Sequence, residues 1–409
     1  MSAATTPLWQ DDPYTPRPAL DGPRSCAVCV IGGGIGGVAT AWHLAEHGIA
    51  ATVLEARTVA GGATGRNGGF FIAGPAPMYD EARRRWGPAR AARVYAATLD
   101  AQRAMLAIAE AIGAREHFRI VGMLRLGVDA AEAVAVRAHH AALAADGFPG
   151  DLIEEGDLPA AIRRPERVAL HTAHDGGVHP ARWVRALARA IEQRGAQIFE
   201  GTRVTAPPAC DGHGVTITTT AGVVRADRAI VAIDGALSTL VPAARAVRCR
   251  RLQMVATAPV TPCWLPMPVY ARDGHEYAQQ LPDGRVTLGG FADVEGASSY
   301  TDVEQPSPAV IALLQRYLRD ELGVTAAVTH RWAGLVGYAD DPLPTCGAVP
   351  GSDGRILALG GYNGTGHVQG FVAARIAAEL AATGASADAD LYAAPGTTTA
   401  GDRSAAPTG

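Results

Sequence analysis

The stretch that most constrains the fold of this 409-residue chain begins with a short apolar run, Cys26 to Ile31, that ends abruptly in glycines. Such a run is typical of a strand buried on both faces of a parallel sheet. Gly32, Gly34 and Gly37 then match the spacing G-x-G-x-x-G. In a dinucleotide-binding unit the first glycine forms a tight turn, the second lets the backbone approach a pyrophosphate, and the third lets helix and strand pack closely.

A helix and a second strand complete this unit. Apolar residues recur at helical spacing from Ile35, and Gly48 provides a stop in which left-handed backbone is accessible. The strand Ala51 to Leu54 leads into Glu55, at the distance where a carboxylate accepts hydrogen bonds from an adenosine ribose. Strand, glycines, helix, strand and acid occur in this order, which favours a dinucleotide site over a purely structural βαβ unit.

A second glycine-rich loop, Gly61 to Phe71, reads GGATGRNGGFF and has neither helical nor strand periodicity. Backbone of this kind can pass close to a large flat ligand. Together with the first unit, this loop indicates that the dinucleotide is FAD.

Five motifs carry a resemblance to a known family: VIGGG at Val30 to Gly34, the acid Glu55, GATGRNGG at Gly62 to Gly69, and two C-terminal stretches. The last two are WAGLVGYADDPLPTCG and GGYNGTGH. The chain resembles the FAD-dependent amine and amino-acid oxidases of the D-amino-acid oxidase and glycine oxidase superfamily, and within it the γ-glutamylputrescine-oxidoreductase-like branch. The resemblance extends from about residue 9 to about residue 380.

The resemblance implies an α/β fold, in which a Rossmann-type FAD-binding domain is joined to an α+β substrate domain with an antiparallel sheet. We expect an N-terminal arm at 1–25, a discontinuous FAD-binding domain at 26–80, 165–245 and 325–381, and a substrate or cap domain at 81–164 and 246–324. Residues 382–409 are expected to form a small polar, disordered tail.

The resemblance also assigns the positions that contact FAD. These are Gly32, Gly34, Ile35, Gly37, Glu55, Ala56, Arg57, Gly62, Ala63, Thr64, Arg66, Asn67, Gly68, Gly69, Val204, Ala232, Gly361, Asn363, Gly364, Thr365, Gly366 and His367. A helix that starts near Gly366 would direct unpaired N–H groups at the flavin edge that becomes negative on reduction.

Four residues are candidates for catalysis or substrate contact: His367, Tyr277, Gln279 and Trp332. His367 lies next to the flavin in this scheme, although a histidine that only caps its own helix is an equal alternative. Tyr277 and Gln279 share one face of an expected strand, which either contacts substrate or is an ordinary half-buried sheet face.

Departures from the family pattern bear on the substrate and the electron acceptor. Leu281 and Val336 stand where relatives that oxidise small amino acids carry a carboxylate-binding arginine. Thr287 takes the place of a lysine that promotes reaction with oxygen in sarcosine-oxidase-like relatives, and the chain contains no lysine at all. Gly334 and Asn67 occupy the positions of flavin-linking residues, so we expect non-covalent FAD.

Composition excludes other classes of function. The net charge of −4 and pI near 6.3 provide no basic field for nucleic acid or an anionic membrane. No apolar run is long enough to span a bilayer and no signal segment is present, so we expect a cytoplasmic monomer or homodimer. The scattered cysteines and the histidines of HTAHDGGVHP do not form a convincing metal site, and none is expected.

The expected reaction is oxidation of a C–N bond in an amine or amino-acid-derived substrate. Hydride would pass to flavin N5, the imine would hydrolyse, and oxygen would reoxidise the flavin to give hydrogen peroxide. Alternatives are a dehydrogenase that uses another acceptor, and a tailoring oxidase or desaturase that acts on a larger substrate. A flavin-binding protein without catalysis is a third hypothesis.

Overall fold

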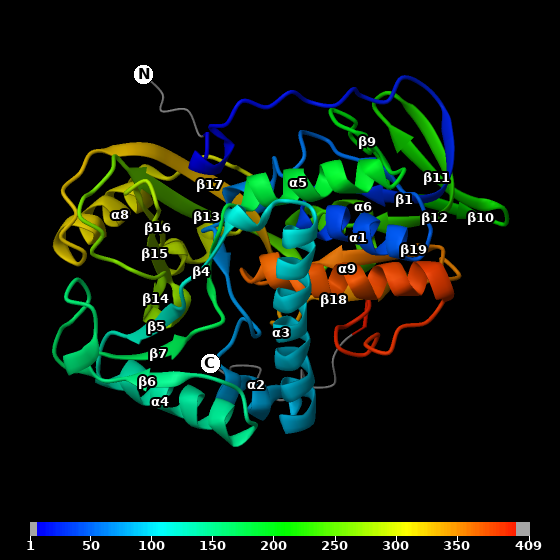
Figure 1. Ribbon diagram of the computed structural model, residues 1–409. Helices are drawn as coiled ribbons and strands as arrows, with labels where there is room; N and C mark the ends of the chain where they lie inside the picture. Colours follow the sequence, from blue (N-terminus) through cyan, green and yellow to red (C-terminus); the bar gives the residue numbers. More distant parts are fainter. Residues whose placement is uncertain (1–5, 398–409) are drawn as a thin grey trace.

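The computed structural model describes residues 6–397 and contains two lobes, each built on an eight-stranded sheet (Figure 1). The first sheet has a parallel core in the order β19-β12-β1-β2-β9. Its strands are β1 (Arg24–Ile31), β2 (Thr52–Leu54), β9 (Gln197–Phe199), β12 (Gly222–Val231) and β19 (Ile356–Gly360), extended by the antiparallel strands β10 (Ala209–Asp211), β11 (Gly214–Thr219) and β18 (Thr345–Ala348).

Three helices, α1 (Ile35–Glu46), α5 (Pro180–Gln193) and α9 (Gly366–Thr383), pack against one another beside this sheet (Figure 1). Their side chains and those of the central strands form one apolar core, in which Val30 and Val53 have no exposed surface. Burial on both faces explains why β1 ends as a continuous apolar run. The predicted strand, helix and strand at the N-terminal end are therefore confirmed.

The second sheet follows the order β17-β13-β16-β15-β14-β5-β7-β6 and is antiparallel except where β14 pairs with β5. Its strands are β5 (Met123–Gly127), β6 (Asp151–Ile153), β7 (Val168–Thr172), β13 (Arg248–Thr257), β14 (Val269–Ala271), β15 (Glu276–Gln280), β16 (Val286–Gly290) and β17 (Val328–Tyr338). Helices α8 (Pro308–Asp320) and α4 (Ala130–Ala145) pack on it. The expected combination of a Rossmann-type domain with a mostly antiparallel sheet domain is confirmed.

A three-stranded sheet and two further helices complete the fold. The small sheet contains β3 (Phe70–Phe71), β8 (Gly176–Val178) and β4 (Phe118–Ile120). The helices are α2 (Tyr79–Trp86) and the long α3 (Pro88–Ala111), and two short helices, α6 (Leu237–Leu240) and α7 (Ala292–Glu295), lie in loops.

Hydrogen bonding divides the chain differently from the expected domains in two places. Strand β7 lies within 165–245, yet it pairs with β5 and β6 of the second sheet. Strand β17 lies within 325–381, yet it pairs along its length with β13. In addition, α3, expected in the cap, packs against α9 and contributes Val94 and Met105 to the core of the first lobe. Local periodicity cannot distinguish these arrangements, because pairing partners are distant in sequence.

The expectation of a disordered tail was wrong for the part of it that the structure describes, 382–397. Leu391 and Tyr392 are buried, Tyr392 donates its hydroxyl hydrogen bond to Gln369 of α9, and Ala393 forms a bridge with Thr345. Two buried apolar side chains are sufficient to attach this otherwise polar segment to the first lobe. The remaining tail positions, 398–409, lie outside the described residues.

The described part of the arm, 6–23, is irregular apart from a short 3-10 turn at Leu8–Gln10, as expected. Leu8, Trp9 and Leu20 are buried, and the Leu20 backbone N–H donates to Thr202. The arm therefore runs over the first lobe as a packed segment. In the described chain, no helix has both the length and the apolarity that crossing a membrane requires.

Candidate active site

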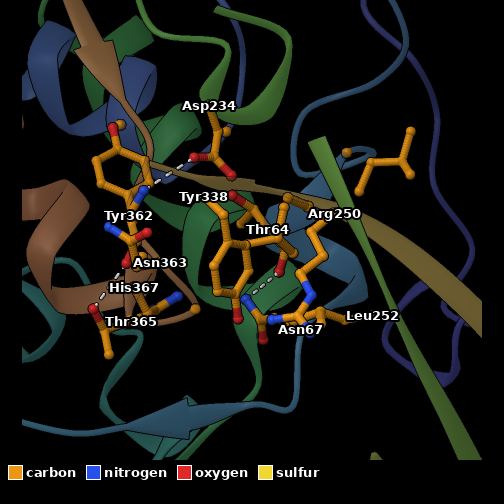
Figure 2. Close-up of a pocket in the computed structure, with 18 of the residues that line it drawn as sticks. Thr64, Asn67, Asp234, Arg250, Leu252, Tyr338, Tyr362, Asn363, Thr365 and His367 are labelled. Atoms are coloured by element: carbon orange, nitrogen blue, oxygen red, sulfur yellow. Dashed lines mark hydrogen bonds between the residues drawn. The ribbon is translucent and has the colours of Figure 1, made fainter. Parts of the chain in front are cut away.

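A cavity of about 680 Å³ lies between the two lobes. It is lined by the end of β1 and the start of α1, by the 62–68 loop, by the turn after β12, by the start of α9, and by strands of the second sheet. Figure 2 shows residues from these separate segments, among them Thr64, Asp234, Arg250 and His367, around one space. All of the positions assigned to FAD line this cavity except Gly37, Gly69 and Gly361.

These three glycines support the walls instead. A Cβ atom on Gly37 would lie 1.9 Å from the carbonyl oxygen of Gly32, so α1 could not approach β1 as closely. Gly69 and Gly361 have φ values of +72° and +69°, in the left-handed region that favours glycine. The spacing pattern therefore identified residues that shape the cavity as well as residues that line it.

The N-terminus of α1 opens into the cavity, and no side chain of the helix itself occupies it. Its N-cap, Gly34, makes no side-chain hydrogen bond, and the first turn contains no acidic residue. Thr64 Oγ1 accepts the Ile35 N–H at 2.9 Å, which fixes the glycine-rich loop against the helix. Free N–H groups and the partial positive charge of a helix N-terminus fit the pyrophosphate of a dinucleotide.

Glu55 lies at the end of β2, beside this helix N-terminus. Its two carboxylate oxygens accept backbone N–H groups from Gly33 and Arg57, each at 2.6 Å. Burial raises the pKa of Glu55, whereas these two hydrogen bonds act in the opposite direction. Because a carboxylate has about four acceptor positions, Glu55 still has capacity for the hydroxyl groups of a ribose.

Two residues that were predicted to contact substrate instead hydrogen-bond the backbone of the loop at 61–69 from β15 and β17. Gln279 is 1 % exposed and donates from Nε2 to the carbonyl oxygens of Gly68 (2.6 Å) and Gly69 (3.1 Å). Trp332 is fully buried and donates from Nε1 to the carbonyl oxygen of Arg66 at 2.9 Å. Neither residue lines the cavity, so the expectation of direct substrate contact is corrected: both position the loop.

The N-terminal arm holds the same loop from another side. Trp9 donates from Nε1 to the carbonyl oxygen of Asn67 at 2.7 Å. Gln10 Nε2 lies within 3.4 Å of the carbonyl oxygens of Ala60, Gly61 and Gly65. Asn67 itself donates to Thr64 and accepts from Gly69. The loop contains one short 3-10 turn, Ala63–Arg66, and is otherwise fixed by side chains from the arm and from β15 and β17.

His367 is in the first turn of α9, which has no side-chain N-cap, and it lines the cavity. It is 6 % exposed, and neither ring nitrogen has a hydrogen-bond partner among the described residues. Burial lowers the pKa of His367 to about 4, so the imidazole is neutral at physiological pH. Two unpaired ring nitrogens beside a helix N-terminus fit a ligand that both donates and accepts hydrogen bonds.

This pKa predicts the pH dependence of any step that involves His367. Because burial disfavours the imidazolium, folded His367 gains a proton only as the pH falls through about 4. The unfolded chain binds this proton at higher pH, so the stability that His367 contributes is lost as the pH falls from about 6.5 to about 4. We expect parallel pH profiles of flavin reduction for the wild type and His367→Asn from about pH 5 to about pH 9. A break near the ordinary histidine pKa that disappears in His367→Asn would contradict this assignment.

The second sheet contributes an aromatic wall. Tyr277 lines the cavity, and its ring centroid lies 5.8 Å from that of Phe70 and 5.9 Å from that of Tyr270. The ring covers Gly289 on the next strand, where a Cβ atom would lie 2.2 Å from it. Of the two predicted contacts on β15, the structure therefore places only Tyr277 at the cavity.

Sequence reasoning missed three cavity residues that carry polar groups: Arg250, Tyr338 and Asp234. Arg250 donates from Nε to Ser299 at 3.0 Å, and its Cζ lies 5.5 Å from the ring centroid of Tyr300 and 5.1 Å from that of Tyr338. Figure 2 shows Arg250 beside Tyr338. Asp234 accepts the backbone N–H groups of Gly337, Gly361 and Tyr362, at 2.9, 3.0 and 3.4 Å. For Arg250 the available signal was strand alternation, which places its side chain on the same face as that of Leu252.

The positions named as departures lie as follows. Val336 lines the cavity beside Arg250, its partner on β13, whereas Leu281 and Thr287 do not line it. Thr287 is fully buried and its hydroxyl has no hydrogen-bond partner among the described residues. Gly334 packs on Arg66, since a Cβ atom there would lie 3.0 Å from that of the arginine.

Comparison with known proteins gives an independent result. The family model described as DAO, FAD dependent oxidoreductase, matches residues 27–380. The chain belongs to this family. The cavity-lining residues of both lobes lie within the matched region. The cofactor of this chain is FAD.

Two curated relatives cover nearly the whole chain. A protein of Rhizobium meliloti (strain 1021) named Probable oxidoreductase OrdL is 30% identical over 384 residues, which is 91% of this chain and 87% of that protein. The gamma-glutamylputrescine oxidoreductase of Escherichia coli (strain K12) is 25% identical over 401 residues, covering 90% and 86%. Both confirm the predicted branch.

A solved structure of glycine oxidase from Geobacillus kaustophilus has the same fold, with a TM-score of 0.75 and 20% identity over 90% of this chain and 98% of that one. At this level of identity the match supports the two-domain architecture alone. The chain is therefore an FAD-dependent oxidoreductase of the DAO family.

Proposed function

We propose that this FAD-dependent oxidoreductase oxidises the C–N bond of an amine. The observation that supports this proposal is a single cavity with two parts: a dinucleotide cradle at the starts of α1 and α9, and an aromatic chamber formed by Phe70, Tyr270 and Tyr277. The named activities of the E. coli relative and of the bacterial glycine oxidase both involve amines.

The cradle residues fit FAD in chemical type. Glu55 would accept the ribose hydroxyls, the start of α1 would face the pyrophosphate, and the start of α9 with His367 would face the flavin. When bound, FAD supplies the two-electron chemistry and the route to an electron acceptor. We propose that it is held non-covalently, because neither Gly334 nor Asn67 offers a nucleophile for attachment.

The protein's own contribution is placement and exclusion of water. The rings of Tyr270 and Tyr277 give the substrate a largely apolar surface, and burial raises the pKa of both hydroxyls, so neither carries charge at neutral pH. An apolar chamber favours the neutral form of an amine, which has the lone pair that oxidation requires. A neutral His367 can accept or donate one hydrogen bond without placing a positive charge beside the substrate.

A dehydrogenase that passes electrons to another carrier is the second candidate. It is favoured by one observation: Thr287, at the position of the oxygen-promoting lysine, is buried away from the cavity, and the chain has no lysine that could replace it. The amine substrate would be the same, and only the oxidative half of the cycle would differ.

The test measures anaerobic reduction of the bound flavin through the loss of flavin absorbance. Primary amines, N-methyl amines, amino acids and polyamine conjugates, including γ-glutamylputrescine, would each be mixed with the holoenzyme. We expect one class to bleach the flavin, and peroxide to form when air is admitted. Turnover with a quinone or dye but not with air would establish the dehydrogenase, and no bleaching by any amine would refute the proposal. Acid precipitation of the same sample is expected to release free flavin.

A further inference from the structure

We propose that Arg125 forms a subsite for a carboxylate at the far end of the substrate from the reacting C–N bond. This inference rests on the proposed amine oxidation and specifies the class of amine. Arg125 is on β5 of the second sheet and lines the cavity. Its position differs from those of Leu281 and Val336, where the family pattern has a carboxylate-binding arginine.

One row of paired residues across the second sheet connects Arg125 to the flavin loop. Trp332 pairs with Met254, Met254 with Gly289, and Gly289 with Tyr277. The row continues from Tyr277 to Tyr270 and from Tyr270 to Arg125. Paired residues on adjacent strands have side chains on the same face. Tyr277, Tyr270 and Arg125, the part of the row that lines the cavity, therefore lie on the same face of the sheet as Trp332.

The two ends of this row have different surroundings. Trp332 donates to Arg66 beneath the loop at 61–69, and the ring of Tyr277 lies near Gly68 of that loop. Adjacent strands are about 4.8 Å apart, so Arg125 lies roughly 10 Å beyond Tyr277 across the sheet. An anion held at Arg125 would therefore be several bonds away from an amine that reacts beside the loop.

Arg125 itself is poised for an anionic ligand. Its side chain is only 13% exposed, yet its guanidinium donates no hydrogen bond to any residue in the described chain. Its nearest opposite charge is the exposed Asp273, with 3.6 Å between Nη1 and Oδ1, and its Cζ lies 5.8 Å from the ring centroid of Tyr270. A largely buried guanidinium with free N–H groups is costly unless a ligand uses them, and a bidentate carboxylate fits its geometry.

The neighbouring Asp273 also discriminates between anions. A carboxylate carries a single negative charge, whereas a phosphate or phosphonate carries up to two at neutral pH. Arg125 and Asp273 together carry no net charge, so a second negative charge on the ligand gains little net attraction and adds to the cost of desolvation. We therefore assign the subsite to a carboxylate, which makes the substrate class an amine with a remote carboxylate.

The experiment compares linear ω-amino acids of increasing length with alkylamines of matched length, using anaerobic flavin bleaching in the holoenzyme. The wild type is expected to bind the best ω-amino acid about 10- to 100-fold more tightly than its matched alkylamine, the range of a charge-assisted hydrogen bond. Arg125→Met should abolish this preference, so that the ω-amino acid and its matched alkylamine reduce the flavin with similar apparent affinity. Arg125→Lys should keep part of it, and Arg84→Met on exposed α2 surface should keep all of it.

A binding assay separates this inference from the proposed function. Simple alkanoates, which lack the amine, should perturb the flavin spectrum of the wild type and bind at least about tenfold more weakly to Arg125→Met. Alkylphosphonates should bind more weakly than alkanoates. If no amine bleaches the flavin, the proposed oxidation fails while the alkanoate result still tests the subsite. Equal alkanoate affinity in the wild type and Arg125→Met, or an unchanged ω-amino acid preference in Arg125→Met, would overturn the inference.

Discussion

Replacement of Gly37 by alanine is expected to abolish FAD binding. The added Cβ would lie 1.9 Å from the Gly32 carbonyl oxygen and 3.4 Å from Cγ1 of Val30, so α1 must move away from β1. The Gly32 carbonyl group is backbone and cannot rotate away from the new methyl group, so the helix must shift. This shift moves the N–H groups at the start of α1 that face the pyrophosphate. Flavin absorbance of the purified protein and FAD titration of the apoprotein measure this effect.

The matched control is Gly212→Ala, a glycine-to-alanine change where no atom lies within 4 Å of the new Cβ. We expect this variant to bind FAD like the wild type. If Gly37→Ala retained wild-type FAD affinity, the close contact between helix and strand would not be required for the cofactor, and our account of the third glycine would be wrong.

Asp234→Ala is expected to destabilise the protein by about 2 to 4 kcal/mol, because several backbone N–H groups would lose their acceptor. Asp234 connects the turn after β12 to β17 and to the loop before α9, through Gly337, Gly361 and Tyr362. Figure 2 shows its hydrogen bond with Tyr362. Loss of these contacts loosens the segment that carries His367. Denaturant unfolding and FAD affinity should therefore change together.

Asp234→Asn separates charge from hydrogen bonding. The amide keeps one carbonyl oxygen as an acceptor, so it should retain part of the stability that alanine loses. A variant Asp234→Ala with unchanged unfolding midpoint and FAD affinity would show that these contacts do not maintain the site.

Particular residues show how far the sequence could predict this site. The glycines from Gly32 to Gly37 and the acid Glu55 were identified because their roles depend on short-range spacing, and the structure gathers them around one cavity. Gln279 and Trp332 were identified as belonging to the site but given the wrong role. Strand alternation shows which residues share a face, but it does not show which of them another loop covers.

Arg125, Arg250 and Asp234 were missed for a related reason. Each reaches the cavity through contacts between segments far apart in sequence: Arg125 through β14, Arg250 through Ser299, and Asp234 through β17 and the loop before α9. The same limit explains the misplacement of β7, β17 and the segment 382–397.

The sequence by itself determined the dinucleotide unit, because glycine spacing and apolar periodicity are local constraints on the backbone. The family resemblance of its motifs implied FAD and a second domain with an antiparallel sheet. Only the tertiary structure decided which side chains face the substrate and which support the cofactor loop. Those roles depend on sheet order and register, and strand pairing between distant segments sets both.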